Sequence, residues 1–568
     1  MAVDTARPVV EAGRVRRLWA APLWAHAAVL ALLLAVLFPL MHPTSAFTSD
    51  EGAYALQVKA LDHGSWTYDY RAAPLDPGGA AFPVILSDSG PSGSYPYVKH
   101  PAYPLLLQAS TRLVGETPGL HLLNLLGVVS AAVAAWLLAG ELDPRLRRPA
   151  FWLAAGGPVL VNGFLIWAHA PSAAVAGLAV AGAARMARRG ITPWVAAGTT
   201  AALVGGVLLR SEGLLLAGAL AMALAAVRIR RTRRLPPGVG AFALVAGPAL
   251  VAAVAERRWT RWIVGGTYTA AAGQVGAASS FLSARVSGAW HELFQAHFIE
   301  RAAAVPVLAA LVVVAGVGFV ALRWWRPWST RLLAAPILLA VGFLVLRLVL
   351  QPYEPVTGLI PAWPLAVLGL LLFRWRGGGP VAGLLGITLV VFTVAILATQ
   401  YAEGGGAEWG GRYLSPALVP LAVLAVAGLA AAVDRAPPAS RRRVVALLAG
   451  FGVAGAVFSV ATAGALRARE DRIVSAVARH PSPVMLTDAR GLPRLAWRDD
   501  GRLTWMLADD AALPALLRSL RAQGVPQVTV VVSSEFPLDA LTAYPVLTEQ
   551  DEPALAGSGI RAVVATGG

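Results

Sequence analysis

Thr48-Ser49-Asp50-Glu51-Gly52-Ala53-Tyr54 comes just after the first long apolar run of this 568-residue chain, which covers roughly residues 19–41. Thr48 and Glu51 have the spacing of a capping box, so a helix is expected to begin here. The residues that follow predict a short amphipathic helix lying on the membrane surface. The stretch therefore predicts two adjacent carboxylates, Asp50 and Glu51, where a membrane span meets water.

The composition indicates an integral membrane protein. The chain is 57% hydrophobic and 14% charged, with a mean hydropathy of +0.63, whereas about a quarter of the residues of a soluble protein are charged. No cysteine is present, which excludes disulfides and thiolate catalysis. Most of the net charge of +16 lies in short loops between apolar runs. There it indicates membrane orientation rather than binding to nucleic acid.

The arginines predict the topology. Arginine-rich loops alternate with loops poor in positive charge if about thirteen spans are counted, and positive loops stay in the cytoplasm. The first apolar run lacks a small-residue cleavage site, so it is expected to remain as a span. This places the N-terminus in the cytoplasm of a multi-pass plasma-membrane protein. Residues 42–100, roughly 256–303 and everything after about 466 are expected on the outer face.

Two domains are predicted, a transmembrane domain over residues 1–465 and an extracytoplasmic domain over residues 466–568. In the second, Val484-Met485-Leu486 and Val528–Val532 have the composition of buried strands, and Ala511–Gln523 has that of a helix. The predicted fold is thus a polytopic α-helical membrane protein with a small C-terminal α/β domain. Its first outer loop, residues 42–100, carries the acidic motif and surface helices.

The two carboxylates of the first motif differ in how far local structure explains them. Glu51 completes the capping box, which accounts for it without chemistry. Asp50 is not needed for the box. A carboxylate at the outer membrane edge can accept a proton from a hydroxyl group, so Asp50 is the candidate general base.

Three arginines at the outer ends of predicted spans, Arg210, Arg347 and Arg412, have two interpretations. An unpaired charge at this depth is unfavourable, so they either reach water or pair with nearby acids such as Glu212 and Glu354. Alternatively they bind phosphate, because the planar guanidinium fork matches two oxygens at once. The sequence leaves both interpretations open.

Four short motifs follow one another, each in a predicted outer-face segment: Ser49-Asp50-Glu51-Gly52-x-Tyr54, Lys99-His100-Pro101-Ala102-Tyr103-Pro104-Leu105, Arg210-Ser211-Glu212-Gly213-Leu214-Leu215 and Gly411-Arg412-Tyr413-Leu414-x-Pro416. Over roughly residues 20–430 the chain resembles the GT-C class of polyprenyl-phosphate-sugar glycosyltransferases. That class includes protein O-mannosyltransferases, lipid A aminoarabinose transferases, and actinobacterial arabinosyl- and mannosyltransferases.

The resemblance implies an enzyme that moves one sugar from a polyprenyl-phosphate donor to a hydroxyl group of a cell-envelope acceptor, which is a polysaccharide, a lipid or a protein. Asp50 would be the general base of an inverting transfer, and Arg210, Arg412 and Arg347 would bind the donor phosphate. Further substrate-binding residues implied by the motifs are Tyr54, Lys99, Glu212 and Tyr413. The GC-rich character of the sequence favours an arabinose or mannose donor.

The chain departs from the family pattern at two places. His169 occupies a turn where the family often has a second acid, and His100-Pro101-Ala102 replaces a His-Pro-Pro element. His169, His100 and Glu51 are therefore secondary acid or base candidates. A divalent cation occurs in the wider class, but the sequence offers no clear ligand set, so no metal or other cofactor is predicted.

Three other functions fit the sequence less well. A polyprenyl-linked glycan polymerase or ligase would also bind lipid phosphates through arginines, but it requires no acidic pair in the first outer loop. A lipid-linked sugar transporter, or flippase, is expected to show internal repeats and polar helix breaks at mid-membrane, and neither is evident. A non-catalytic envelope scaffold leaves the order of the motifs unexplained.

Overall fold

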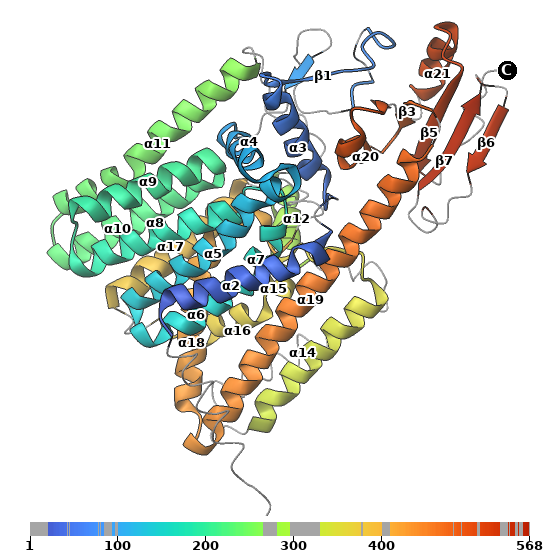
Figure 1. Cartoon of the computed structure of the whole chain (residues 1–568). Coiled ribbons are helices and arrows are strands. Elements are labelled where there is room, and N and C mark those ends of the chain that lie inside the picture. Colours follow the sequence, from blue (N-terminus) through green and yellow to red (C-terminus); the bar gives the residue numbers. More distant parts are fainter. Residues whose placement is uncertain are drawn as a thin grey trace, which may run out of the picture.

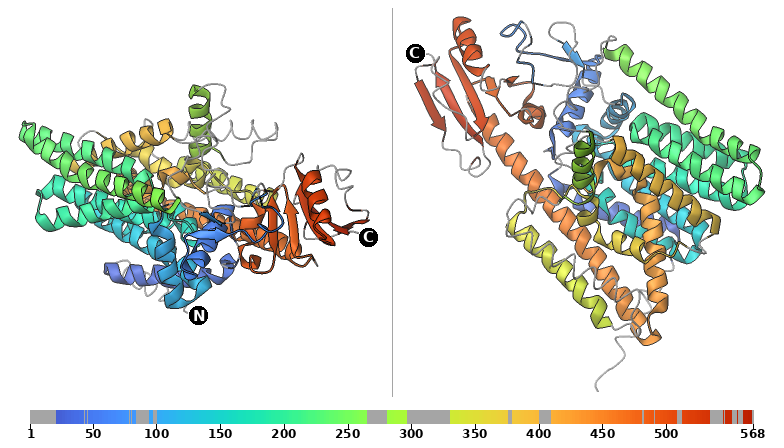
Figure 2. Two further views of the ribbon diagram at one scale, coloured as in Figure 1. Left: turned by 90° about the horizontal axis from the view of Figure 1, so that it is seen from above. Right: turned by 180° about the vertical axis from the view of Figure 1, so that it is seen from behind.

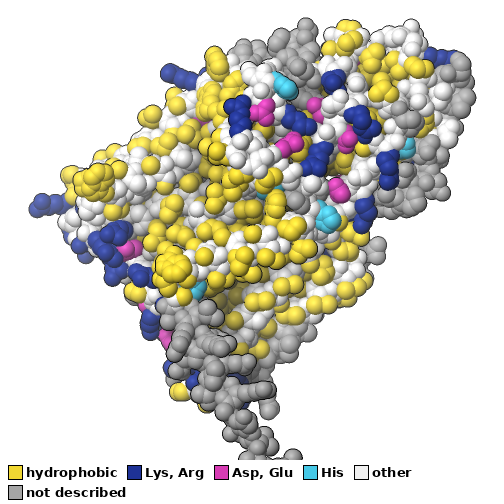
Figure 3. Space-filling view, in the orientation of Figure 1, with side chains coloured by type: hydrophobic (Ala, Val, Ile, Leu, Met, Phe, Trp, Pro, Cys, Tyr) yellow, Lys and Arg dark blue, Asp and Glu magenta, His cyan; other side chains and the backbone are white. Residues whose placement is uncertain are grey.

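The computed structural model describes residues 21–42, 44, 46–77, 79, 81–83, 94–96, 100–264, 281–295, 330–375, 379–399, 409–480, 482–489, 491–507, 512–533, 544, 546–550, 555 and 560–566. A large bundle of helices carries a small sheet at one end (Figures 1 and 2). In the space-filling view, charged side chains gather near the two ends of the molecule and apolar side chains cover the band between them (Figure 3).

The bundle is built mainly from long apolar helices. Its helices are α2 (Leu23–Leu37), α5 (Glu116–Leu142), α6 (Arg147–Ala155), α7 (Pro158–Phe164), α8 (His169–Arg189), α9 (Pro193–Leu209), α10 (Glu212–Thr232), α11 (Pro236–Val264), α14 (Thr330–Leu350), α15 (Leu359–Ala362), α16 (Pro364–Leu372), α17 (Gly379–Thr399), α18 (Leu418–Arg435) and α19 (Pro438–Ala478). Small residues allow their backbones to approach closely. A Cβ on Gly127 of α5 would lie 2.6 Å from the backbone nitrogen of Pro171 in α8, a contact typical of membrane helix pairs.

Seven helical segments among the described residues are long and apolar enough to cross a membrane, and shorter apolar helices include Leu23–Leu37 and Pro193–Leu209. This supports a multi-pass membrane protein. The count of about thirteen spans is not confirmed, and part of it falls on residues 265–280 and 296–329, outside the described residues.

The segment predicted to be the first outer loop, together with the residues that follow it, forms α3 (Ser49–Asp62), the hairpin β1 (Thr67–Asp69) with β2 (Ser94–Pro96), and α4 (Ala102–Val114). Helix α3 begins where the capping box predicts. The Glu51 carboxylate accepts hydrogen bonds from the backbone amides of Phe47 at 2.6 Å and Thr48 at 3.1 Å. Helix α3 does not lie open on a membrane surface, because every residue from Glu51 to Val58 is buried. The C-terminal domain packs against α3 and removes the exposed face that the sequence pattern implied.

The C-terminal region contains a five-stranded sheet of order β4-β3-β5-β7-β6. The strands are β3 (Val484–Thr487), β4 (Thr504–Leu507), β5 (Gln527–Ser533), β6 (Val546–Gln550) and β7 (Ile560–Thr566), with helices α20 (Leu492–Leu495) and α21 (Leu513–Ala522). β3 is parallel to β4 and β5, while β7 is antiparallel to β5 and β6. β3, β5 and α21 fall where the sequence predicts two strands and a helix. Helix α19 runs unbroken through residue 466, so the proposed domain boundary falls inside a helix.

Candidate active site

Asp50 lies in the first turn of α3 between two guanidinium groups. Its Oδ2 is 3.4 Å from Nη2 of Arg412, at the start of the 3-10 helix η4 (Arg412–Ala417), and its Oδ1 is 3.6 Å from Nη1 of Arg494 in α20. Arg412 also lies over the rings of Trp167 and Tyr413, with centroid distances of 5.7 Å and 5.3 Å. The three charged side chains are between 14% and 19% exposed. Asp50, the candidate base, is thus partly accessible to solvent, and ion pairs with two arginines hold its carboxylate in place.

Glu51 has a structural role, because its carboxylate is buried and fully engaged in contacts with neighbouring segments. Its side chain is 0% exposed, and Oε2 pairs with Nη2 of Arg467 at 2.5 Å. The same oxygen accepts the amide of Ile166 at 2.8 Å, and Oε1 accepts the two capping amides. These interactions join α3 to α19 and to the turn before α8. The carboxylate therefore fixes the position of the helix that carries Asp50.

The second predicted cation, Arg210, is matched by an acid. Its Nε and Nη2 donate to the two oxygens of Glu212 at 3.1 and 2.5 Å, and its Nη1 lies 3.1 Å from Nε2 of His169. Nδ1 of His169 is 3.4 Å from the hydroxyl of Ser415. The structure therefore joins the motif around Arg210 to the turn at His169 and to η4. The pairing with Glu212, which the sequence left as an alternative, is present.

Two other predicted residues, Arg347 and His100, lie in different surroundings. Arg347, 1% exposed, donates to the backbone carbonyls of Gln351 and Glu354 at the end of α14. His100 has a left-handed backbone with φ of 51° and lies 3.3 Å from Glu256. Lys99 lies outside the described residues.

The two predicted tyrosines both lie near the charged residues of the site. Tyr54, 6% exposed, packs edge-to-face on Tyr103 at a centroid distance of 4.9 Å. Tyr103 in turn donates to the side chain of Asn124 at 3.0 Å. Tyr413 lies beside Arg412, and its backbone amide donates to Oε2 of Glu292 at 3.3 Å.

Glu292, in α12 (Phe281–Leu293), is a carboxylate near the site that sequence reasoning missed. It is 2% exposed, and burial raises its pKa to about 7, although the Tyr413 amide and Arg412 both act to lower it. Its only signal in the sequence was its place beside Trp290 in a segment predicted to be on the outer face. Glu292 lies in helix α12, not in the turn at His169, where the sequence resemblance implies a second acid.

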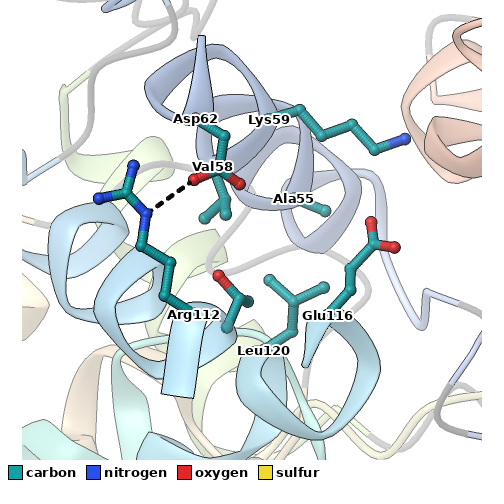
Figure 4. Close-up of a pocket in the computed structure, with 8 residues that line it drawn as sticks. Ala55, Val58, Lys59, Asp62, Arg112, Glu116 and Leu120 are labelled. Atoms are coloured by element: carbon teal, nitrogen blue, oxygen red, sulfur yellow. Dashed lines mark hydrogen bonds and ion pairs between the residues drawn. The ribbon is translucent and has the colours of Figure 1, made fainter. Parts of the chain in front are cut away.

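A separate cavity of about 250 Å³ lies further along α3, between that helix and the α4–α5 corner (Figure 4). Its polar lining includes Lys59, Asp62, Arg112 and Glu116, and Asp62 pairs with Arg112 at 3.3 Å. Burial lowers the pKa of Lys59, partly offset by Glu116. Asp50 does not line this cavity. Within the described part of the chain, no cluster of three His, Asp or Glu side chains is arranged to hold a metal ion.

No protein-family model and no curated protein matches this sequence. The structure is similar to that of ArnT from Cupriavidus metallidurans bound to undecaprenyl phosphate, with 13% identity, 95% of this chain and 97% of that chain covered, and a TM-score of 0.48. It is also similar to the oligosaccharyltransferase AglB from Archaeoglobus fulgidus in complex with an inhibitory peptide and a dolichol-phosphate. That match has 15% identity, covers 89% of this chain and 69% of the other, and has a TM-score of 0.47. Both neighbours are glycosyltransferases of the GT-C fold, the class that the four sequence motifs resemble.

Proposed function

We propose that this protein is a membrane glycosyltransferase that moves a single sugar from a polyprenyl-phosphate donor to a hydroxyl group of an extracytoplasmic acceptor. The observation that carries the proposal is the position of Asp50, a partly accessible carboxylate set between guanidinium groups near the end of a helical membrane bundle. In this proposal residues 1–465 form the catalytic membrane domain. The N-terminus is cytoplasmic, and residues 466–568 lie outside the cell.

The proposed step is an inverting displacement. The acceptor hydroxyl gives its proton to Asp50 while its oxygen attacks the anomeric carbon. The bond from that carbon to the phosphate oxygen breaks on the opposite face, and the polyprenyl phosphate leaves with the electron pair. Arg412, fixed near Asp50 and held over two aromatic rings, stabilises the growing phosphate charge without having to reorganise.

The experiment is transfer of a radiolabelled sugar from a polyprenyl-phosphate donor in membranes that contain the protein, with arabinose and mannose donors tested first. Uptake of labelled lipid is measured in the same preparation. Transfer that depends on the protein supports the proposal. Lipid movement without transfer supports a flippase instead, and mass spectrometry of copurifying lipid identifies the donor.

Replacing Arg412 with Gln is expected to weaken donor binding by roughly 1.5–3 kcal/mol, the usual contribution of a hydrogen bond to a charged group, and to slow transfer. Lys should restore binding only in part, because it lacks the guanidinium fork. The measurement is a donor titration with each purified variant.

Arg210→Gln is the comparison variant. Arg210 remains a predicted phosphate ligand, but a phosphate must first displace Glu212 from the same guanidinium edge. Donor affinity unchanged in both Gln variants would show that the two arginines are structural.

Glu292→Gln is expected to stabilise the protein increasingly as the pH rises. In the folded protein the carboxyl stays protonated up to about pH 7, but in the unfolded chain it ionises near pH 4.5. The stability that its protonated form provides is present below pH 4.5 and is lost as the pH rises through 7. Gln keeps an oxygen for the Tyr413 amide and carries no charge. The gain above pH 7 is at most about 3 kcal/mol, since one pKa unit is about 1.4 kcal/mol.

The melting temperatures of the wild type and Glu292→Gln are compared in detergent at pH 5 and pH 8. A difference that widens toward pH 8 is the expected result. An equal difference at both pH values would contradict the raised pKa of Glu292.

A further inference from the structure

The C-terminal region packs closely along α3. Gly52, two residues after Asp50, has no side chain because a Cβ there would clash with the backbone carbonyl of Arg494. One end of the contact is thus fixed by backbone packing. Near the other end, Nζ of Lys59 donates to the carbonyl of Trp497 at 2.9 Å and lies over its ring. Helix α20 lies beside α3 (Figure 1). The Arg494 side chain thereby reaches Asp50 in the first turn of α3.

The charges around the site are unequally paired. Arg210 is matched by Glu212, and Arg467 is matched by Glu51, each at 2.5 Å. Asp50, by contrast, is shared by Arg412 and Arg494 at the longer distances of 3.4 and 3.6 Å. Two guanidiniums that share one carboxylate favour an anion close to them.

The guanidinium of Arg494 has an edge that Asp50 does not use. Nη1 faces Asp50, whereas Nε is buried and has no hydrogen-bond partner within the described part of the chain. In Arg210 the corresponding Nε and Nη2 atoms both donate to Glu212. A buried donor without a partner is unfavourable, and more so when it is charged. The Nε side of Arg494 therefore fits an acceptor that is absent from the chain itself, and phosphate oxygens match this fork.

We propose that Arg494 is a phosphate ligand of the transfer site, so that the C-terminal domain supplies one side of the donor-binding site. The inference rests on the proposed function and deepens it. The phosphate of the lipid donor accepts from the Nε edge of Arg494 and draws positive charge away from Asp50. Because Asp50 is then held less strongly by its arginines, its carboxylate becomes a better proton acceptor once the donor is in place.

The test measures binding of sugar-free undecaprenyl phosphate to the full-length protein in detergent, which requires no catalysis. Wild type is compared with Arg494→Gln, Arg494→Lys and Asp50→Asn. The matched control is Arg498→Gln, because Arg498 belongs to the same segment but is exposed and donates to Thr117. Undecaprenol, which lacks the phosphate, and inorganic phosphate are the two ligand controls. Gly52→Ala displaces the Arg494 backbone without changing any charge, and melting temperatures confirm that each variant is folded.

Arg494→Gln and Gly52→Ala are expected to weaken undecaprenyl phosphate binding roughly 10- to 100-fold, corresponding to a charged hydrogen bond, and Arg494→Lys should recover part of it. Arg498→Gln should bind as wild type, and Asp50→Asn as well or more tightly, because a competing carboxylate is gone. Equal affinity of Arg494→Gln and wild type would overturn the proposal, as would equal wild-type binding of undecaprenol. Inorganic phosphate bound through Arg494 without any lipid binding would assign the site to a soluble phosphate and overturn the lipid assignment. Arg494-dependent lipid binding in a protein that transfers no sugar would refute the proposed function and leave this inference standing.

Discussion

Asp50→Asn is expected to bind the donor lipid at least as well as the wild-type protein and to lose sugar transfer by roughly 10²–10⁴-fold, the usual contribution of a positioned general base. Asn keeps the size of the side chain and an oxygen for Arg412 and Arg494, but it cannot take a proton. The measurement is single-turnover sugar transfer at saturating donor, with a thermal-unfolding assay of the same sample.

Asp62→Asn is the matched control for this experiment. Asp62 is another carboxylate of α3, but it pairs with Arg112 near the far end of the helix. It should transfer as wild type. Near wild-type transfer by Asp50→Asn would place the base elsewhere, with His169, His100 and Glu292 as the next candidates. Loss of folding would instead make Asp50 a structural residue.

The parts of the site that could be predicted from the sequence are those that local patterns encode. The capping box gave the start of α3, since Thr48 and Glu51 are three residues apart. The outer ends of apolar runs identified Arg210 and Arg412, which the structure places around one site with His169. The short apolar runs at Val484–Leu486 and Val528–Val532 located β3 and β5 of the C-terminal sheet.

The residues that the sequence patterns did not identify come close to the site only through tertiary packing. Arg494 follows a strand of the C-terminal domain, and nothing in its local sequence distinguishes it from the other arginines there. Arg467 lies near the end of the apolar part of α19, where it resembles a topology-determining charge, yet it is completely buried. Glu292 lies in an outer segment with no periodic pattern. Their roles depend on which distant parts of the chain pack together. The spacing of residues along the sequence does not reveal that packing.

The Glu51–Arg467 pair is expected to be the most important single contribution to the stability of the site. Both side chains are 0% exposed and are joined at 2.5 Å. Breaking a buried ion pair from one side leaves a charge without compensation, which usually destabilises a protein by about 3–5 kcal/mol. Arg467→Met is therefore expected to lower the free energy of unfolding by about that amount. Glu51→Gln still accepts the capping amides but strands the Arg467 charge, so it should also destabilise strongly.

The double variant Glu51→Gln with Arg467→Met removes both charges and is expected to recover much of the loss, because no uncompensated charge remains in the interior. The measurement is a double-mutant cycle of denaturant unfolding in detergent. Arg112→Met is the control, since its pair with Asp62 is largely exposed, and an exposed pair usually contributes at most about 1 kcal/mol. Losses that simply add in the double variant would mean that the two side chains stabilise α3 independently. A coupled loss would show that the two side chains act as one buried ion pair, which fastens α3, the helix that carries Asp50, to α19.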